Sequence, residues 1–201
     1  DNNDPIAPIS SFQIDFYEWL SDGPCDFLPG TLLYSCTIPV ADVSHKYECT
    51  VEQLDVYRYT AYLPEPCYQQ EEQHFVLRIA ATLSDPDVPD RFFWATSSVQ
   101  NGTAGASYQY QDDDWECADY DNAFELHTAS IKYEQPINCD DYVYFSNLNS
   151  NENLWLRHDD FVCNQTGEIR SIEFWGQGFD LDTWQGCGVP DLTGFQLELY
   201  E

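Results

Sequence analysis

Positively charged residues are scarce in this sequence. Seven lysines and arginines stand against 36 aspartates and glutamates, which gives a net charge of −29 at pH 7. Such a chain repels the phosphates of nucleic acids and of anionic membranes, so the composition excludes nucleic acid as a partner. Solubility through self-repulsion, adaptation to an acidic medium, and a medium rich in salt or calcium each account for the charge.

Methionine and long hydrophobic runs are absent. No apolar stretch reaches the length of about 18 residues that a transmembrane helix needs, so no membrane insertion is expected. The chain starts at Asp1 and contains no methionine. We therefore expect a mature, secreted form from which a signal peptide has been removed.

The sequence also lacks any Cys-x-x-Cys pair, although it has eight cysteines. Zinc sites usually place two cysteines within about two to four residues of each other. The even number favours four disulfides and an oxidising compartment, while the connectivity stays open. The predicted disulfide cysteines are Cys25, Cys36, Cys49, Cys67, Cys117, Cys139, Cys163 and Cys187.

Two Asn-x-Thr sequons support an extracellular setting. Asn101 lies in a stretch with the composition of an exposed turn, and Asn164 is followed by Gln165 and Thr166. Sequons are the acceptors of N-linked glycans in secreted proteins. We expect a glycoprotein modified at both asparagines.

Helical periodicity is nearly absent, and alternation with a period of two recurs along the chain. Phe12, Ile14 and Phe16 alternate with polar residues, and the same pattern recurs around Tyr57 and Phe75. Each run is typical of a half-buried strand. A short helical turn is expected near residues 39–44. We predict an all-β protein, with one antiparallel β-sandwich or jelly-roll-like domain over residues 12–201. Residues 1–11 are predicted to form an extended or flexible N-terminal arm.

Catalytic signatures are missing as well: there is no Gly-x-Ser-x-Gly and no phosphate-binding glycine loop. The strongest binding candidate is the segment 174–188, which combines two tryptophans, two glutamines and four glycines with an Asp-x-Asp pair. Sugar sites combine flat apolar surfaces with a few well-placed polar groups. The alternative is that the tryptophans fill the core. The predicted ligand-binding residues are Trp175, Gln177, Asp180, Asp182 and Trp184.

An acidic stretch at residues 112–121 is a candidate calcium site. Calcium prefers about six to eight oxygen ligands, which clustered carboxylates can supply. The spacing of an EF-hand is absent, and a solvated acidic loop is the alternative. The candidate ligands are Asp112, Asp113, Asp114 and Asp119.

The segment 168–176 resembles the Glu-Ile-Asp-x-x-Glu strand of laminarinase-type glycoside hydrolases, a β-sandwich family. The resemblance implies Glu168 as nucleophile and Glu173 as acid/base, on one face of a strand that contains a β-bulge. Arg170 stands where that family has an aspartate.

Two functions follow from these observations. The first is a secreted, non-catalytic glycoprotein that serves as a carbohydrate-binding or structural surface module, with a glycan or neighbouring copies of itself as partner. The second is a secreted glycoside hydrolase that uses paired carboxylates. The lack of a catalytic signature favours the first.

Overall fold

The computed structural model describes residues 9–20, 28–51, 54–83, 91–99, 106–109, 114–117, 120–128, 131–140, 143–145, 155–180 and 185–186. Several predicted site residues lie outside these ranges: Cys25, Cys187, Asn101, Asp112, Asp113, Asp119, Asp182 and Trp184. Residues 1–8 of the expected arm also lie outside them. Residues 9–11 begin the first strand.

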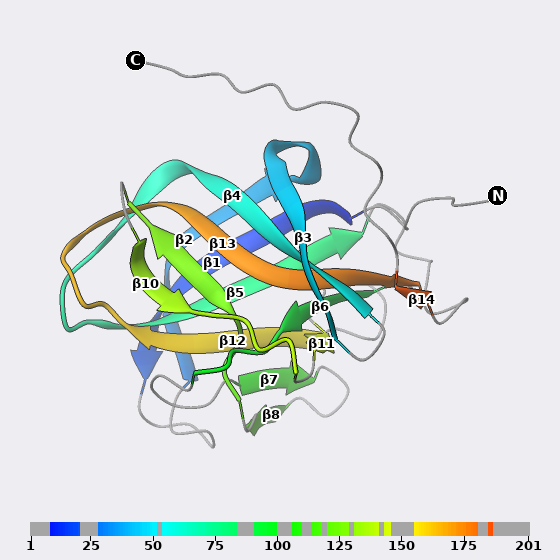
Figure 1. Ribbon diagram of the computed structural model, residues 1–201. Helices are drawn as coiled ribbons and strands as arrows, with labels where there is room; N and C mark the ends of the chain where they lie inside the picture. Colours follow the sequence, from blue (N-terminus) through cyan, green and yellow to red (C-terminus); the bar gives the residue numbers. More distant parts are fainter. Residues whose placement is uncertain are drawn as a thin grey trace, which may run out of the picture.

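Two antiparallel sheets make up almost all of the described chain (Figure 1). Sheet A has the strand order β2-β1-β5-β12-β7-β8. Its strands are β1 (Ile9–Leu20), β2 (Leu28–Pro39), β5 (His74–Leu83), β7 (Ala106–Gln109), β8 (Asp114–Cys117) and β12 (Trp155–Val162).

Sheet B has the order β10-β9-β13-β4-β3, with β6 and β14 also paired to β13 and β11 paired to β6. Its strands are β3 (Val43–Val51), β4 (Leu54–Gln69), β6 (Arg91–Ala95), β9 (Phe124–His127), β10 (Ile131–Gln135), β11 (Val143–Phe145), β13 (Gly167–Asp180) and β14 (Gln185–Gly186). The 3-10 helix η1 (Val40–Asp42) joins β2 to β3, where the sequence predicts a helical turn.

The main core collects apolar side chains from both sheets. Phe12 of β1 packs edge-on against Phe174 of β13, with ring centroids 5.0 Å apart. Phe174 in turn stacks on Tyr59 of β4 at 5.3 Å. Because alternate residues of a strand point to opposite sides, the polar residues between these aromatics lie on the outer face of sheet B.

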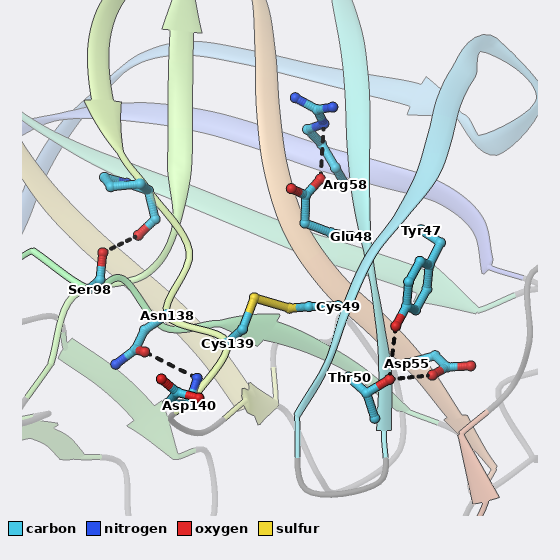
Figure 2. Close-up of a disulfide and its surroundings, with 11 residues drawn as sticks. Tyr47, Glu48, Cys49, Thr50, Asp55, Arg58, Ser98, Asn138, Cys139 and Asp140 are labelled. Atoms are coloured by element: carbon cyan, nitrogen blue, oxygen red, sulfur yellow. Dashed lines mark hydrogen bonds and ion pairs between the residues drawn. A yellow bond between two sulfur atoms is a disulfide. The ribbon is translucent and has the colours of Figure 1, made fainter.

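The outer face of sheet B carries a second, smaller core around Trp175. Val51, Val56, Ala95 and Ala123 are its other buried members, and Ile137 packs against it. A disulfide joins Cys49 of β3 to Cys139 in the segment that follows β10 (Figure 2). The disulfide therefore fixes the segment after β10 beside one end of the outer face.

The all-β prediction and the predicted alternation in β1, β4 and β5 are confirmed. Within the described ranges, the predicted disulfide cysteines Cys49 and Cys139 are bonded to each other. Cys36, Cys67 and Cys163, however, are thiols in this structure, which differs from the expectation that all eight cysteines are paired. The Cys163 thiol donates a hydrogen bond to Oε1 of Gln69 at 2.6 Å.

No helix among the described residues is long and apolar enough to cross a membrane.

Candidate functional site

The central strand β13 brings the polar residues of the outer face together. Glu173 lies directly opposite Glu125 of β9 on one side and opposite Thr60 of β4 on the other. Glu125 also lies opposite Glu134 of β10. Three glutamates therefore stand side by side across three neighbouring strands, which are spaced about 4.8 Å apart.

The next row along the strands holds His127, Ser171 and Tyr62. Ser171 is the register partner of both His127 and Tyr62. Tyr62 is 69% exposed. It is a diagonal neighbour of Glu173, a relation that places residues about 7–8 Å apart. An exposed aromatic ring thus adjoins the carboxylates.

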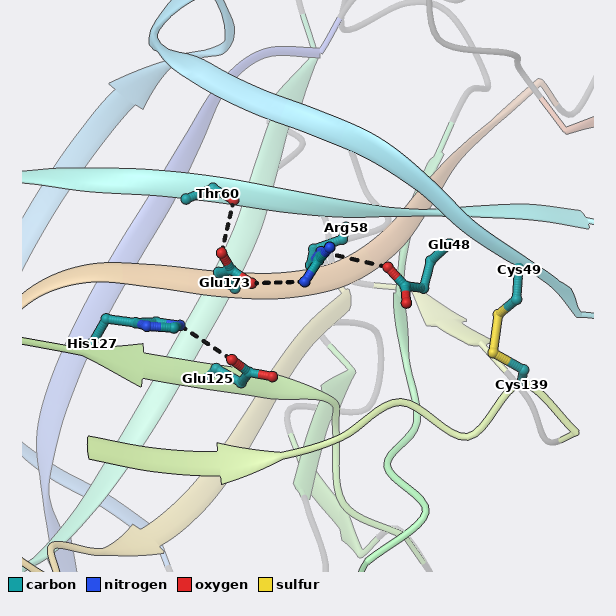
Figure 3. Close-up of polar contacts among 8 residues, drawn as sticks. All are labelled: Glu48, Cys49, Arg58, Thr60, Glu125, His127, Cys139 and Glu173. Carbon is teal, nitrogen blue, oxygen red and sulfur yellow. Dashed lines mark hydrogen bonds and ion pairs between the residues drawn. A yellow bond between two sulfur atoms is a disulfide. The ribbon is translucent and has the colours of Figure 1, made fainter. Parts of the chain in front are cut away.

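Arg58 of β4 is the cation of this site. Its guanidinium lies 3.4 Å from Oε2 of Glu173 and 3.4 Å from Oε2 of Glu48 (Figure 3). Thr60 Oγ1 donates a hydrogen bond of 3.2 Å to the other oxygen of Glu173. The contacts of Glu173 with Arg58 and with Thr60 are both long, so neither holds its carboxylate tightly.

Glu125 and His127 point to the same side of β9 (Figure 3). Nε2 of His127 lies 3.2 Å from Oε2 of Glu125. The nitrogen is shielded from solvent, but it has no partner with the geometry of a hydrogen bond. It is therefore a buried polar atom whose bonding capacity is unused.

Burial raises the pKa of Glu125, and the neighbouring carboxylate of Glu173 raises it further. His127 and Arg58 act in the opposite direction on the same pKa. Like charges directly opposite in a sheet are destabilising, so this row of carboxylates favours binding a proton or a cation.

We define the Glu-His-Glu cluster as Glu125, His127 and Glu173. One ligand atom of each residue lies within 4.8 Å of the others. Two carboxylates and an imidazole are a set that can coordinate a divalent metal. Among the residues that the structure describes, this cluster is the group of potential metal ligands whose ligand atoms lie this close together.

The structure does not bring the predicted carboxylate pair together. Glu168 and Glu173 are five residues apart on β13, which corresponds to roughly 16 Å of strand. A glycosidase needs its two carboxyl groups within about 5–9.5 Å of each other. Glu168 is instead paired with Arg170 at 2.6 Å, at the exposed end of the strand. The strand is irregular between Ile169 and Ser171, as the bulge in the resemblance implies.

The predicted sugar-binding segment is in part a strand. Trp175 is only 3% exposed and belongs to the smaller core, so its ring is not a ligand platform. Gln177 and Asp180 lie further along β13. Trp184 and Asp182 are outside the described residues. The alternative that a tryptophan of this segment fills a core is confirmed for Trp175.

The calcium candidates and sequons are described only in part. Asp114 is the first residue of β8 and Cys117 its last. Asn164 is exposed between β12 and β13, where Thr166 Oγ1 accepts a hydrogen bond from the Glu71 N–H.

Four residues of this site were not predicted from the sequence: Glu125, His127, Arg58 and Tyr62. Glu125 and His127 form an i, i+2 pair in a short alternating segment, which places both on one face. That local signal does not reveal that β13 lies beside β9.

Comparison with protein-family models, with curated proteins and with solved structures gave no match.

Proposed function

We propose that this protein is a secreted, non-catalytic glycoprotein with a β-sandwich fold of the jelly-roll kind, and that it binds carbohydrate on the outer face of sheet B. The proposal rests on the position of Tyr62, an exposed ring beside a row of hydrogen-bonding side chains. The ring offers a flat apolar surface to a pyranose. Glu173, Thr60 and Arg58 offer acceptors and donors to its hydroxyls.

The surroundings support this proposal. The paired strands fix the backbone that carries these polar groups, so little backbone freedom is lost on binding. The Cys49–Cys139 disulfide fits an oxidising compartment. A net charge of −29 is compatible with a neutral sugar and unfavourable for phosphate-rich ligands.

Glycan-array binding followed by calorimetry tests the proposal. Tyr62→Ala should weaken binding by roughly 1–3 kcal/mol if the ring lies at the centre of the contact. Tyr68→Ala is the matched control, because Tyr68 is 61% exposed on the same strand but lies opposite Glu168. Equal loss in both variants, or no glycan bound by the parent protein, contradicts the proposal.

A second candidate is a retaining glycoside hydrolase that uses Glu125 and Glu173. The observation in its favour is their proximity, because atoms of the two carboxylates lie within 4.8 Å. Retaining enzymes place the two groups about 5–5.5 Å apart and need one with a raised pKa as the proton donor. Glu125 has the raised pKa, and Glu173, beside Arg58, would be the nucleophile.

A reducing-sugar assay on polysaccharides tests this second candidate. Glu173→Gln should abolish any hydrolysis, whereas Glu168→Gln should leave it unchanged because Glu168 lies far along the strand. Activity that depends on Glu168 contradicts the pairing of Glu125 with Glu173.

A further inference from the structure

We propose that the Glu-His-Glu cluster binds a divalent transition-metal ion, with Zn²⁺ as the best fit. The three residues present one imidazole nitrogen and two carboxylates from adjacent strands. Their ligand atoms lie within 4.8 Å of one another. This site is distinct from the acidic loop that the sequence suggested for calcium.

The unused nitrogen of His127 is the observation that points to a metal. A buried polar atom without a partner costs free energy, and Nε2 of His127 is shielded from solvent with no hydrogen bond. It lies 3.2 Å from a Glu125 oxygen, and Glu173 of the neighbouring strand has its carboxylate in contact with Thr60 and Arg58 (Figure 3). A metal between the three groups would satisfy this nitrogen and both carboxylates.

The repulsion between the carboxylates supports the same conclusion. Glu134, Glu125 and Glu173 are consecutive cross-strand neighbours, and within the described part of the chain Arg58 forms its ion pairs with Glu173 and Glu48. A bound dication would offset this unfavourable row.

The ligand types select the metal. Imidazole nitrogen suits zinc and other transition metals, whereas calcium prefers an all-oxygen set. Zinc ligands lie about 2.0–2.2 Å from the ion, so neighbouring ligand atoms come about 3.3 Å apart. Binding would require the side-chain torsions of Glu125 and Glu173 to bring their oxygens closer together. Three protein ligands leave at least one coordination position for water or an outside ligand.

The inference goes beyond sugar binding and does not depend on it. If both hold, the open position lies on the same face as Tyr62, where a sugar oxygen could occupy it. A metal on Glu125 and proton donation by Glu125 exclude each other. Zinc should therefore inhibit any hydrolase activity of this cluster.

Calorimetric titration of the metal-free protein with ZnCl₂ at pH 7 tests the inference without any sugar. One site per chain is expected, with calcium at least tenfold weaker. His127→Gln and Glu173→Gln should each weaken zinc binding at least tenfold, and Glu168→Gln should leave it unchanged. The last variant is the matched control, since it removes the same charge from the same strand.

Cobalt substitution separates a defined site from loose attraction to an acidic surface. Co²⁺ should give a visible absorption band in the parent protein and in Glu168→Gln, and none in His127→Gln. Thermal melts of the metal-free variants verify that all remain folded. Zinc affinity that is unchanged in His127→Gln, or lost equally in Glu168→Gln, overturns the inference. Failure of glycan binding alone leaves it standing.

Discussion

At the scale of single residues, Asp159 of β12 is a fully buried carboxylate in the described structure. Its Oδ2 accepts a hydrogen bond from the N–H of Asn122, and its Oδ1 has no partner. Burial raises the pKa of Asp159 well above its ordinary value, and the carboxylate of Asp121 adds to the rise. The charged form of Asp159 therefore weakens the folded state.

We expect Asp159→Asn to raise the melting temperature at pH 7. The amide oxygen of the new side chain can still accept the hydrogen bond from the Asn122 N–H. The variant no longer buries a charge at position 159. The sign follows from linkage: a raised folded pKa means that stability falls as pH rises from the unfolded to the folded pKa. The gain in melting temperature should therefore vanish at a pH below both the unfolded and the folded pKa of Asp159. Melting curves at pH 7 and near pH 3 measure it, and a variant less stable than the parent at pH 7 contradicts the argument.

The three thiols give a second prediction at this scale. Burial raises the pKa of Cys67 to about 12 and also raises the pKa of Cys163. Thiolate is the reactive form, so both should react slowly with a thiol reagent in the native protein. After unfolding in guanidinium without reductant, at least three thiols per chain should react. Fewer than three would contradict the three thiols described here, and none at all would restore the expectation that all eight cysteines are paired.

Residue chemistry was only partly predictable from the sequence. Glu173 was chosen as a candidate with Glu168 as its partner, because a motif gives neighbours in sequence. Its spatial neighbour Glu125 comes from a strand 48 residues earlier, and that register depends on the whole sheet. Trp175 was misplaced because composition alone does not show which face of a strand is covered. Here a disulfide-linked segment lies beside that face.

At the scale of elements, β13 runs close to the backbone of β6. Gly176 pairs with Trp94 of β6 and with Tyr57 of β4. A Cβ atom at this position would lie 2.3 Å from the carbonyl oxygen of Phe93 and 2.4 Å from the Phe92 ring. The glycine therefore allows the close approach of the two strands.

We expect Gly176→Ala to destabilise the protein by about 1–3 kcal/mol, the usual cost of overpacking a core. The backbone carbonyl of Phe93 cannot turn aside as a side-chain end could. Urea denaturation measures the change. Arg170→Ala, in the exposed part of β13, is the control and should stay within about 0.5 kcal/mol of the parent. A Gly176 variant of parental stability contradicts the close approach.

The existence of the strands was predictable because alternation is a local property. The pairing of β13 with β4, β9 and β6 was not predictable, since paired residues lie far apart in the sequence, as Gly176 and Tyr57 do at 176 − 57 = 119 positions. Gly176 belongs to the predicted sugar-binding segment 174–188, yet it is needed inside a strand. Glycine occurs both in loops and at close backbone contacts inside strands, and only the tertiary contact distinguishes the two cases.

At the scale of the whole molecule, the carboxylates outnumber the cations by 36 to seven. Ion pairs such as Arg78 with Asp15 and Arg58 with Glu173 can engage only a minority of the acids. Unpaired carboxylates repel one another, and this repulsion is greater in the compact state. Burial raises the pKa values of Glu125 and Asp159, and repulsion by neighbouring carboxylates raises them further.

We therefore expect the melting temperature to hold or rise as the pH falls from 7 to 4.5 in low salt. Wherever a carboxyl pKa is raised, the folded state binds protons more readily than the unfolded state. The free energy of unfolding therefore increases as the pH falls through that range. Acids paired with arginine act in the opposite direction, but they are few. Added NaCl at pH 7 should also raise the melting temperature, because it screens the same repulsion. The salt effect should shrink at pH 4.5, where fewer carboxylates are charged. Calorimetry over both variables tests the argument, and a melting temperature that falls steadily between pH 7 and 4.5 in low salt contradicts it.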